Sequence, residues 1–140
     1  MKSLPPFHLA IPVHNLKKAH DFYGNLLNCQ QGRSSSHWID YNFFGHQLVV
    51  HLDQKFNTNS LNTTVDGKEI PVPHFGLVLD WTDWQSLKDK LENAKLDFII
   101  DPYIRFKGQI GEQATMFLLD PSSNALEFKA FKNTDQLFTH

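Results

Sequence analysis

The chain has 140 residues, with 13 Lys and Arg against 15 Asp and Glu and a formal net charge of -2. This length is typical of a single domain. The near-neutral charge gives no electrostatic reason to expect nucleic acid or a membrane surface as a partner. No apolar run approaches the roughly 18 to 20 residues that span a bilayer, the N-terminus lacks an apolar signal-peptide core, and Cys29 has no second cysteine to pair with. We therefore expect a cytoplasmic protein in a reducing compartment.

The first half predicts the order strand, helix and then two or three strands. An apolar strand is expected over 7–13, and Asn15 is expected to cap a helix that runs to about Leu27 with its apolar residues on one face. After the helix we expect a turn at 32–36, a strand over 38–44, a tight turn at Gly45-His46 and a strand over 47–52. The polar segment 53–71 is predicted to be a long loop with a turn at Asp66-Gly67.

The second half repeats this order. Its expected elements are a strand over 74–79, a helix capped by Thr82 and running to about Ala94, and strands over 97–100, 113–119 and 125–131. His8 and His74 each open a half and lead through an apolar strand into a helix, which indicates an internal repeat. His51 and Glu127 each fall inside the apolar strand that closes a half, so we treat them as equivalent positions.

The repeat suggests a metal site. A lone His or Glu in a strand is more often an ordinary edge or solvent-facing residue, and Glu127 shares its strand face with Lys129. If the halves pack about a pseudo-twofold axis, however, their first and last strands converge and bring His8, His51, His74 and Glu127 to one centre. Two imidazoles and one carboxylate hold a divalent metal and leave open positions, and such mixed ligands suit Fe(II), Mn(II) or Zn(II) without choosing among them.

The sequence motifs resemble those of the vicinal oxygen chelate superfamily, which includes glyoxalase I, fosfomycin-resistance enzymes, bleomycin-resistance proteins and extradiol dioxygenases. The resemblance runs over nearly the whole chain and is carried by Phe7–Val13, Ala19–Tyr23, Pro73–Gly76 and Phe117–Phe128. The last segment looks like the family's D-P-x-G-N ending before a Glu, with Ser123 where Gly is usual. Within the superfamily the chain is most similar to small stand-alone proteins described as predicted extradiol dioxygenases.

The resemblance implies an α+β fold of two βαβββ modules, related by a pseudo-twofold axis, that form an open U-shaped mixed sheet around a metal. The single domain of residues 1–140 would comprise module 1 at about 5–53, a linker at 54–71 and module 2 at about 72–132. The implied metal ligands are His8, His74 and Glu127, with Fe(II) favoured and Mn(II), Zn(II) or Ni(II) as alternatives. His51 would be a fourth ligand or an acid/base group, and a core or edge histidine remains an alternative.

The implied function is a metal-dependent oxidoreductase of the extradiol dioxygenase type, which binds a small substrate through vicinal oxygens. A glyoxalase-type lyase or isomerase and a non-catalytic binding or resistance protein are the alternatives. Full extradiol dioxygenases carry a Tyr on the strand before the Glu ligand, in the neighbourhood of Phe117 here. Tyr103 or Arg105 could reach the site from a loop, and Arg105 and Lys107 could bind an anionic group, although a solvated loop explains them equally well. The resemblance also implies a homodimer.

Overall fold

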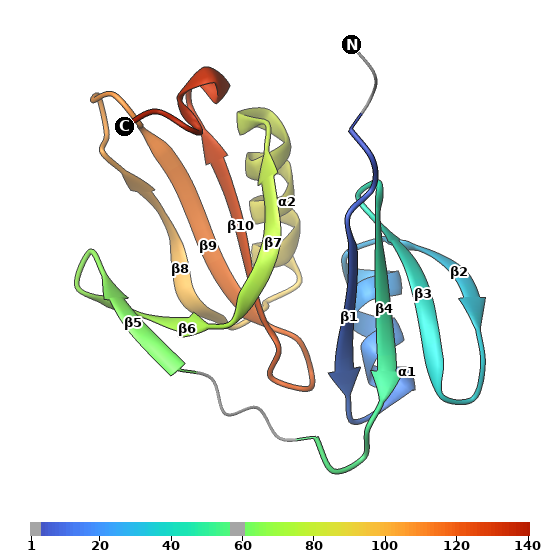
Figure 1. Ribbon diagram of the computed structural model, residues 1–140. Helices are drawn as coiled ribbons and strands as arrows, with labels where there is room; N and C mark the ends of the chain where they lie inside the picture. Colours follow the sequence, from blue (N-terminus) through green and yellow to red (C-terminus); the bar gives the residue numbers. More distant parts are fainter. Residues whose placement is uncertain (1–3, 57–60) are drawn as a thin grey trace. The chain divides into compact units, whose positions relative to one another are not determined.

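The computed structural model describes residues 4–56 and 61–140, with the side chains of 61–64 left out. The chain divides into two compact units (Figure 1): unit 1 is Met1–Thr58 with Asp120–Asn124, and unit 2 is Asn59–Leu119 with Ala125–His140. In the part of the chain that the structure describes, no helix is long and apolar enough to cross a membrane.

Unit 1 is a mixed sheet with the strand order β1-β4-β3-β2, in which β1 and β4 run parallel. Its strands are β1 (His8–Val13), β2 (Gln30–Ser34), β3 (Trp38–Phe43) and β4 (His46–Leu52). Asn15 caps the helical segment as predicted, since its side chain accepts a hydrogen bond from the Lys18 amide at 2.9 Å. The segment begins as α1 (Leu16–His20) and continues as the π-helix η1 (Asp21–Leu26).

The strand β2 was not predicted from the sequence. Residues 32–34, expected in a turn, extend β2 along the edge of the sheet, where every residue of the strand is exposed. An exposed edge strand needs no apolar alternation, so the usual pattern was absent. In β1 and β4 the buried Ile11, Val13 and Val50 share one face, and the exposed His8 and His51 share the other, on which Val49 is also buried.

The D-P-S-S-N turn at Asp120–Asn124 belongs to unit 1. The Tyr23 hydroxyl donates to Asp120 Oδ2 at 2.7 Å, and Asp120 Oδ1 accepts from the amides of Ser122 and Asn124 at 2.8 and 2.9 Å. The Asn124 side chain in turn donates to the Pro12 carbonyl at 2.8 Å. Asp120 is 4% exposed, so these hydrogen bonds compensate for burying its carboxylate.

Unit 2 repeats the topology of unit 1, with the strand order β7-β10-β9-β8 and β7 parallel to β10. Its elements are β7 (His74–Leu79), α2 (Trp81–Asn93), β8 (Phe98–Arg105), β9 (Gln113–Leu119), β10 (Ala125–Phe131) and the 3-10 turn η2 (Thr134–Gln136). The helix begins after Asp80, two residues before the predicted Thr82 cap, and Trp84 anchors it by donating to the Phe128 carbonyl at 2.8 Å. The chain thus contains two βαβββ modules, as predicted.

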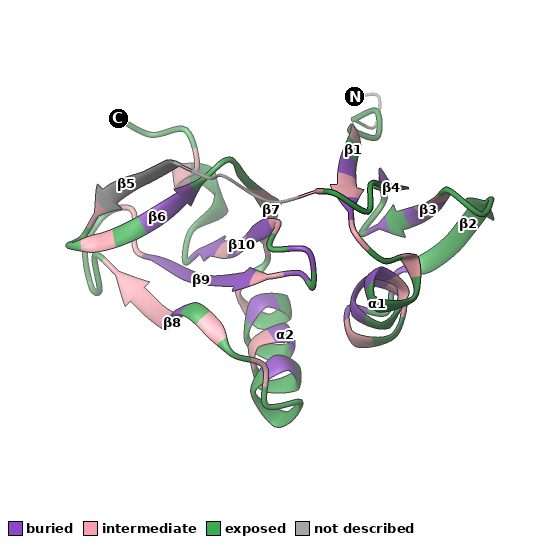
Figure 2. Ribbon diagram, turned by 90° about the horizontal axis from the view of Figure 1, so that it is seen from below, coloured by how far each residue is buried: buried purple, intermediate pink, exposed green. Residues whose placement is uncertain are grey.

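The segment 53–71, expected to be a loop, instead contains a hairpin of β5 (Leu61–Val65) and β6 (Lys68–Val72), which belongs to unit 2, while residues 57–60 lie outside the described residues. The predicted turn at Asp66-Gly67 is confirmed: both residues have positive φ, at 51° and 73°, as a tight hairpin turn requires. The hairpin lies on the side of the unit 2 sheet opposite α2 (Figure 2), where Ile70 packs with Ile100 and Phe117. The sequence did not predict this packing, because the segment 53–71 is mostly polar.

Candidate metal centre

His74 and Glu127 meet on the face of the unit 2 sheet opposite α2, which we call the open face although the hairpin packs on part of it at Phe117. In the parallel pair β7–β10, His74 pairs with Ala125 and Gly76 with Glu127, so strand alternation directs both side chains to the same face. His74 Nε2 lies 3.1 Å from Glu127 Oε2. Two ligand atoms bound at a right angle to one metal, each at about 2.1 Å, are about 3 Å apart. The pair therefore has the spacing of neighbouring metal ligands.

The His74 ring is held in the orientation that metal binding needs. Its Nδ1 lies 2.8 Å from the Pro71 carbonyl oxygen, which can only accept, so Nδ1 carries the hydrogen and Nε2 is the nitrogen that can ligate. The Phe117 ring packs edge-to-face against the imidazole, with 5.1 Å between ring centroids. The hydrogen bond to Glu127 raises the pKa of His74, although burial alone would lower it.

The two oxygens of the Glu127 carboxylate have different neighbours. Oε2 faces His74, whereas Oε1 accepts from the Thr115 hydroxyl at 3.1 Å and lies 3.5 Å from Lys129 Nζ. Burial would raise the pKa of Glu127, but the hydrogen bond from His74, the charge of Lys129 and the hydrogen bond from Thr115 together hold the pKa below its ordinary value. The carboxylate is therefore ionised, and Oε2 is the oxygen placed to bind a cation.

Gly76 permits the close approach of β7 and β10 at this point. A Cβ atom at Gly76 would lie 1.6 Å from the Glu127 backbone oxygen, far inside any real contact. Only glycine therefore fits at position 76, directly opposite the backbone of Glu127.

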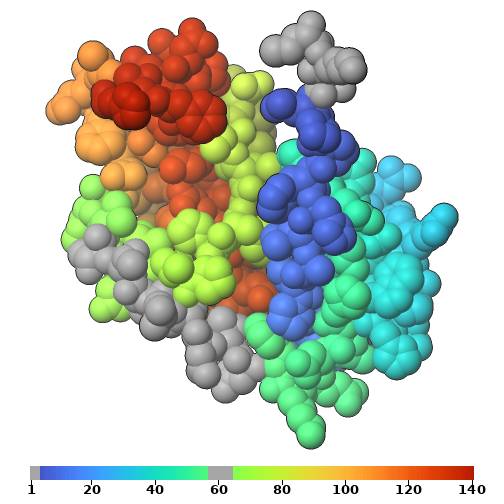
Figure 3. All heavy atoms as spheres, in the orientation of Figure 1, coloured from blue at the N-terminus to red at the C-terminus, as the bar shows by residue number. Residues whose placement is uncertain are grey.

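His8 and His51 are exposed and lie on the same face of the unit 1 sheet, on β1 (drawn in blue in Figure 3) and β4. His8 Nδ1 lies 2.8 Å from Gln47 Oε1, which leaves Nε2 as the nitrogen able to bind a metal. His8 pairs with Gln47, and His51 pairs with Pro12, four residues further along β1. Four residues span about 13 Å of strand, so the register disfavours His8 and His51 as ligands of one ion.

The strand register also corrects the predicted equivalence of His51 and Glu127. Glu127 lies two residues beyond the partner of His74, and the residue two beyond the partner of His8 is Val49. The apolar run around His51 concealed this offset, because register depends on strand pairing. The structure brings His74 and Glu127 together, whereas ligation by His8 and a catalytic role of His51 stay predictions. Among the described residues no group of three His, Cys, Asp or Glu side chains surrounds a metal position.

Tyr103 and Arg105 lie on β8 rather than on a loop, and both contact the hairpin. The Tyr103 hydroxyl donates to Asp66 Oδ2 at 2.9 Å, and Arg105 forms an ion pair with the same carboxylate. Sequence reasoning missed Asp66 as their partner, and it missed Thr115 as a neighbour of the Glu127 carboxylate. Alternation along β10 placed Lys129 on the same strand face as Glu127, as the structure shows, but Thr115 required the register of β9.

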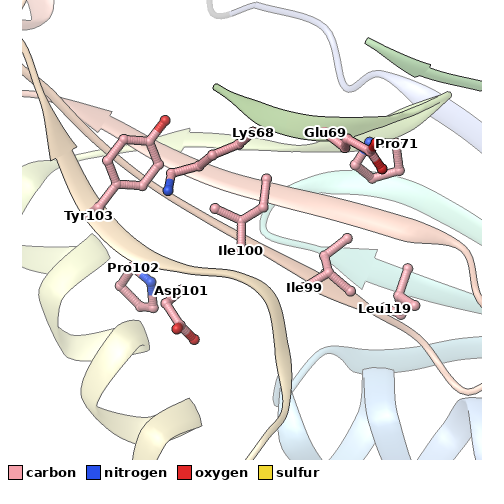
Figure 4. Close-up of a pocket in the computed structure, with 9 residues that line it drawn as sticks. All are labelled: Lys68, Glu69, Pro71, Ile99, Ile100, Asp101, Pro102, Tyr103 and Leu119. Carbon is pink, nitrogen blue, oxygen red and sulfur yellow. The ribbon is translucent and has the colours of Figure 1, made fainter. Parts of the chain in front are cut away.

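A pocket of about 610 Å³ lies between the hairpin and β8 (Figure 4), with Lys68 and Tyr103 at one end and Ile100 and Leu119 along it. Leu119 pairs with Ala125, which pairs with His74, so the pocket adjoins the row of the sheet that carries His74. Its volume is in the range of small-molecule sites.

The comparison with solved structures decides the family. A glyoxalase/bleomycin resistance protein/dioxygenase from Alicyclobacillus acidocaldarius is 34% identical to this chain, with a TM-score of 0.79, over 95% of this chain and 96% of that chain. The chain belongs to the glyoxalase/bleomycin resistance/dioxygenase superfamily, the vicinal oxygen chelate proteins.

More distant vicinal oxygen chelate structures share only the fold. A lactoylglutathione lyase from Agrobacterium tumefaciens is 14% identical with a TM-score of 0.66, over 96% of each chain. A fosfomycin resistance protein from Listeria monocytogenes is 13% identical with a TM-score of 0.63, over 97% of this chain and 98% of that chain. No protein-family model and no curated protein matches the sequence.

The residues present fit the metal that vicinal oxygen chelate proteins typically use. His74 offers an imidazole nitrogen oriented by Pro71, and Glu127 offers an ionised carboxylate oxygen 3.1 Å away. Nitrogen and oxygen ligands of this kind bind Fe(II), Mn(II), Zn(II) or Ni(II).

Proposed function

We propose that the protein is a metal-dependent enzyme that binds a small substrate through two neighbouring oxygens and acts as an extradiol-type dioxygenase. The observation that carries the proposal is the His74–Glu127 pair, with 3.1 Å between its ligand atoms and its imidazole held by Pro71. His8 is the proposed third ligand, and Fe(II) is the proposed metal, with Mn(II), Zn(II) or Ni(II) as alternatives. The metal would supply Lewis-acid stabilisation of the negative charge that develops on the substrate oxygens.

Val49 favours a set of three ligands over four. A four-ligand site needs a donor atom in unit 1 at the place that matches Glu127, and the aliphatic side chain of Val49 has none. Two His and one carboxylate leave adjacent positions for substrate and O2, as in non-haem Fe(II) oxygenases.

We propose that His51, exposed on the same face of the unit 1 sheet as His8, moves a proton to or from the substrate. The pocket beneath the hairpin is large enough for a small substrate.

One observation favours a second candidate, a glyoxalase-type lyase or isomerase. Phe117 pairs with Glu127 across β9 and β10, in the neighbourhood where full extradiol dioxygenases carry a Tyr. A phenylalanine ring packs against His74 but cannot donate a hydrogen bond to a substrate oxygen. The same ligands would serve either reaction, because both develop negative charge on chelated oxygens.

Metal loading tests the ligand set. Freshly purified protein is loaded anaerobically with Fe(II), Mn(II) or Zn(II), and bound metal is counted for the wild type, His8→Ala, His74→Ala and Glu127→Gln. His37→Ala is the control, since His37 is an exposed histidine of unit 1 whose Nδ1 contacts Ser36. We expect about one metal per chain in the wild type and the control, and strong loss in the other three variants. A wild-type content below about a tenth of a metal per chain would contradict the enzyme proposal and favour a non-catalytic binder.

A substrate screen then separates the two reactions. Loaded protein is mixed with catechols and, separately, with 2-oxoaldehyde–thiol adducts. Oxygen uptake with a catechol supports the dioxygenase, and consumption of the adduct without oxygen uptake supports the lyase or isomerase. Sedimentation of the same samples tests the homodimer implied by the family resemblance.

A further inference from the structure

We propose that the open face of unit 2 carries an anion-binding subsite beside Glu127, in which Lys129 binds an oxyanion group of the substrate and Gln113 accepts a hydrogen bond from one of its hydroxyls. The assignment of this anion to the substrate rests on the proposed function. The substrate class is then a hydroxylated compound with a carboxylate or a phosphate close to the oxygens that chelate the metal.

Lys129 lies where it could contact a substrate bound to the metal that Glu127 is proposed to hold. It follows Glu127 by two residues on β10, so both side chains lie on the open face, and the Lys129 side chain is 29% exposed against 14% for Glu127. Its Nζ lies 3.5 Å from Glu127 Oε1, which already accepts from Thr115, and 5.7 Å from the centroid of the Phe131 ring. An ammonium group has three N–H donors, so these two long contacts leave donors for a bound anion.

A bound metal would strengthen the attraction of this face for an anion. Glu127 and Lys129 balance one another in the metal-free protein, and His74 must be neutral to bind a metal, so a divalent ion would add positive charge beside Lys129. Arg105, the cation of β8, is paired with Asp66. Lys129 therefore differs from Arg105: its ion-pair partner, Glu127, is also a proposed metal ligand.

Gln113 supplies an independent observation. Its side chain is 7% exposed, and its Oε1 atom is buried without a hydrogen-bond partner in the described part of the chain. Its Nε2 donates to the Gly111 carbonyl at 3.3 Å, so the oxygen is the free end of the amide. Lys129 pairs with Thr115, two residues after Gln113, which makes Lys129 and Gln113 diagonal neighbours on one face, about 7 to 8 Å apart. A buried acceptor without a partner is costly, and a ligand hydroxyl would satisfy it.

The subsite can be tested without any metal. Backbone amide shifts of the metal-free protein are followed by NMR during addition of benzoate, 3-hydroxybenzoate or inorganic phosphate. We expect saturable shifts at residues 113–117 and 127–131, and the benzoate and phosphate arms distinguish the two oxyanions. Lys129→Met should weaken binding by about 10-fold, because a charge-assisted hydrogen bond is lost. Lys129→Arg should retain binding.

One variant is the control and another tests the second residue of the subsite. Lys132→Met removes a nearby cation that lies over the Trp81 ring, and it should bind as the wild type does. Gln113→Leu should remove the advantage of 3-hydroxybenzoate over benzoate. The inference is wrong if none of the probes gives saturable shifts around Lys129 in the wild type, or if Lys129→Met binds them unchanged. Neither result depends on metal loading, so failure of this inference and failure of the proposed function are distinguishable.

Discussion

Val49 occupies the place in unit 1 that Glu127 occupies in unit 2. Each lies two residues beyond the strand partner of a histidine that opens its unit, Gln47 for His8 and Ala125 for His74. The two βαβββ modules therefore share a topology but not a ligand set. By the same register His51 matches Lys129, so each module carries a nitrogen-bearing side chain two residues further along its last strand.

His51→Ala tests the role that this register leaves for His51. We expect the variant to keep its metal content, because His51 lies about 13 Å along the sheet from the row of His8. Turnover should fall by about 10² to 10⁴, the usual cost of losing an acid/base group. Bound metal and turnover are measured on the same samples, and a loss of metal would return His51 to the ligand set.

Thr115→Val tests the support of the Glu127 carboxylate. The change keeps the shape of a residue that is 3% exposed but removes its hydrogen bond to Oε1. We expect metal affinity to fall by about 10-fold or more, as for other residues that orient a metal ligand. Competition with a chelator measures the affinity. Thr115→Ser keeps the hydroxyl and should bind metal nearly as tightly as the wild type; equal weakening of both variants would point to packing instead.

Gly76→Ala should disrupt the pairing of β7 and β10. The added Cβ would lie 1.6 Å from the Glu127 backbone oxygen, and neither strand can move without breaking their ladder. We expect a loss of about 3 kcal/mol or more in the free energy of unfolding, measured by urea denaturation. Gly32→Ala is the matched control, since its Cβ would come no closer than 3.4 Å to Asp40. Similar costs for the two variants would show that the contact is relieved easily.

Tyr23→Phe should destabilise unit 1 by about 1.5 to 3 kcal/mol, the usual worth of a hydrogen bond to a charged group. The hydroxyl is fully buried and donates to Asp120 at 2.7 Å, and this burial raises the pKa of Tyr23 well above its ordinary value. Tyr41→Phe removes a hydrogen bond to His20 and should cost less, about 1 kcal/mol. Urea denaturation compares them, and a smaller loss for Tyr23→Phe would contradict the anchoring role of Asp120.

Asp66→Asn should lower stability at neutral pH but not in acid. The hydrogen bond from Tyr103, helped by Arg105, lowers the pKa of Asp66 below its ordinary value of 3.8. A lowered folded-state pKa contributes stability above the ordinary value, and this contribution is lost as the pH falls through the folded pKa. The difference between wild type and Asp66→Asn in urea midpoint should therefore shrink between pH 5 and the most acid pH at which the protein stays folded, and a constant difference would contradict the ion-pair origin.

How far the sequence reached is clearest in unit 2. Strands over 74–79, 113–119 and 125–131 are predicted with the bounds that the structure shows, because their apolar residues are contiguous or alternate. The Asn15 cap and the Asp66-Gly67 turn are equally local signals, and the motifs carried the family resemblance. By contrast, β2 and the β5–β6 hairpin were missed, because polar strands lack an apolar pattern to mark them.

The tertiary structure decided which side chains meet. Whether Val49 or His51 matches Glu127 depends on the register of parallel strands, and that register is set by hydrogen bonds between segments far apart in the chain. The hydrogen bonds of Thr115 to Glu127 and of Tyr103 to Asp66 arise in the same way. Local sequence determined the apolar strands, the Asn15 cap and the residue types available for chemistry, whereas strand pairing selected the partners of the Glu127 and Asp66 carboxylates.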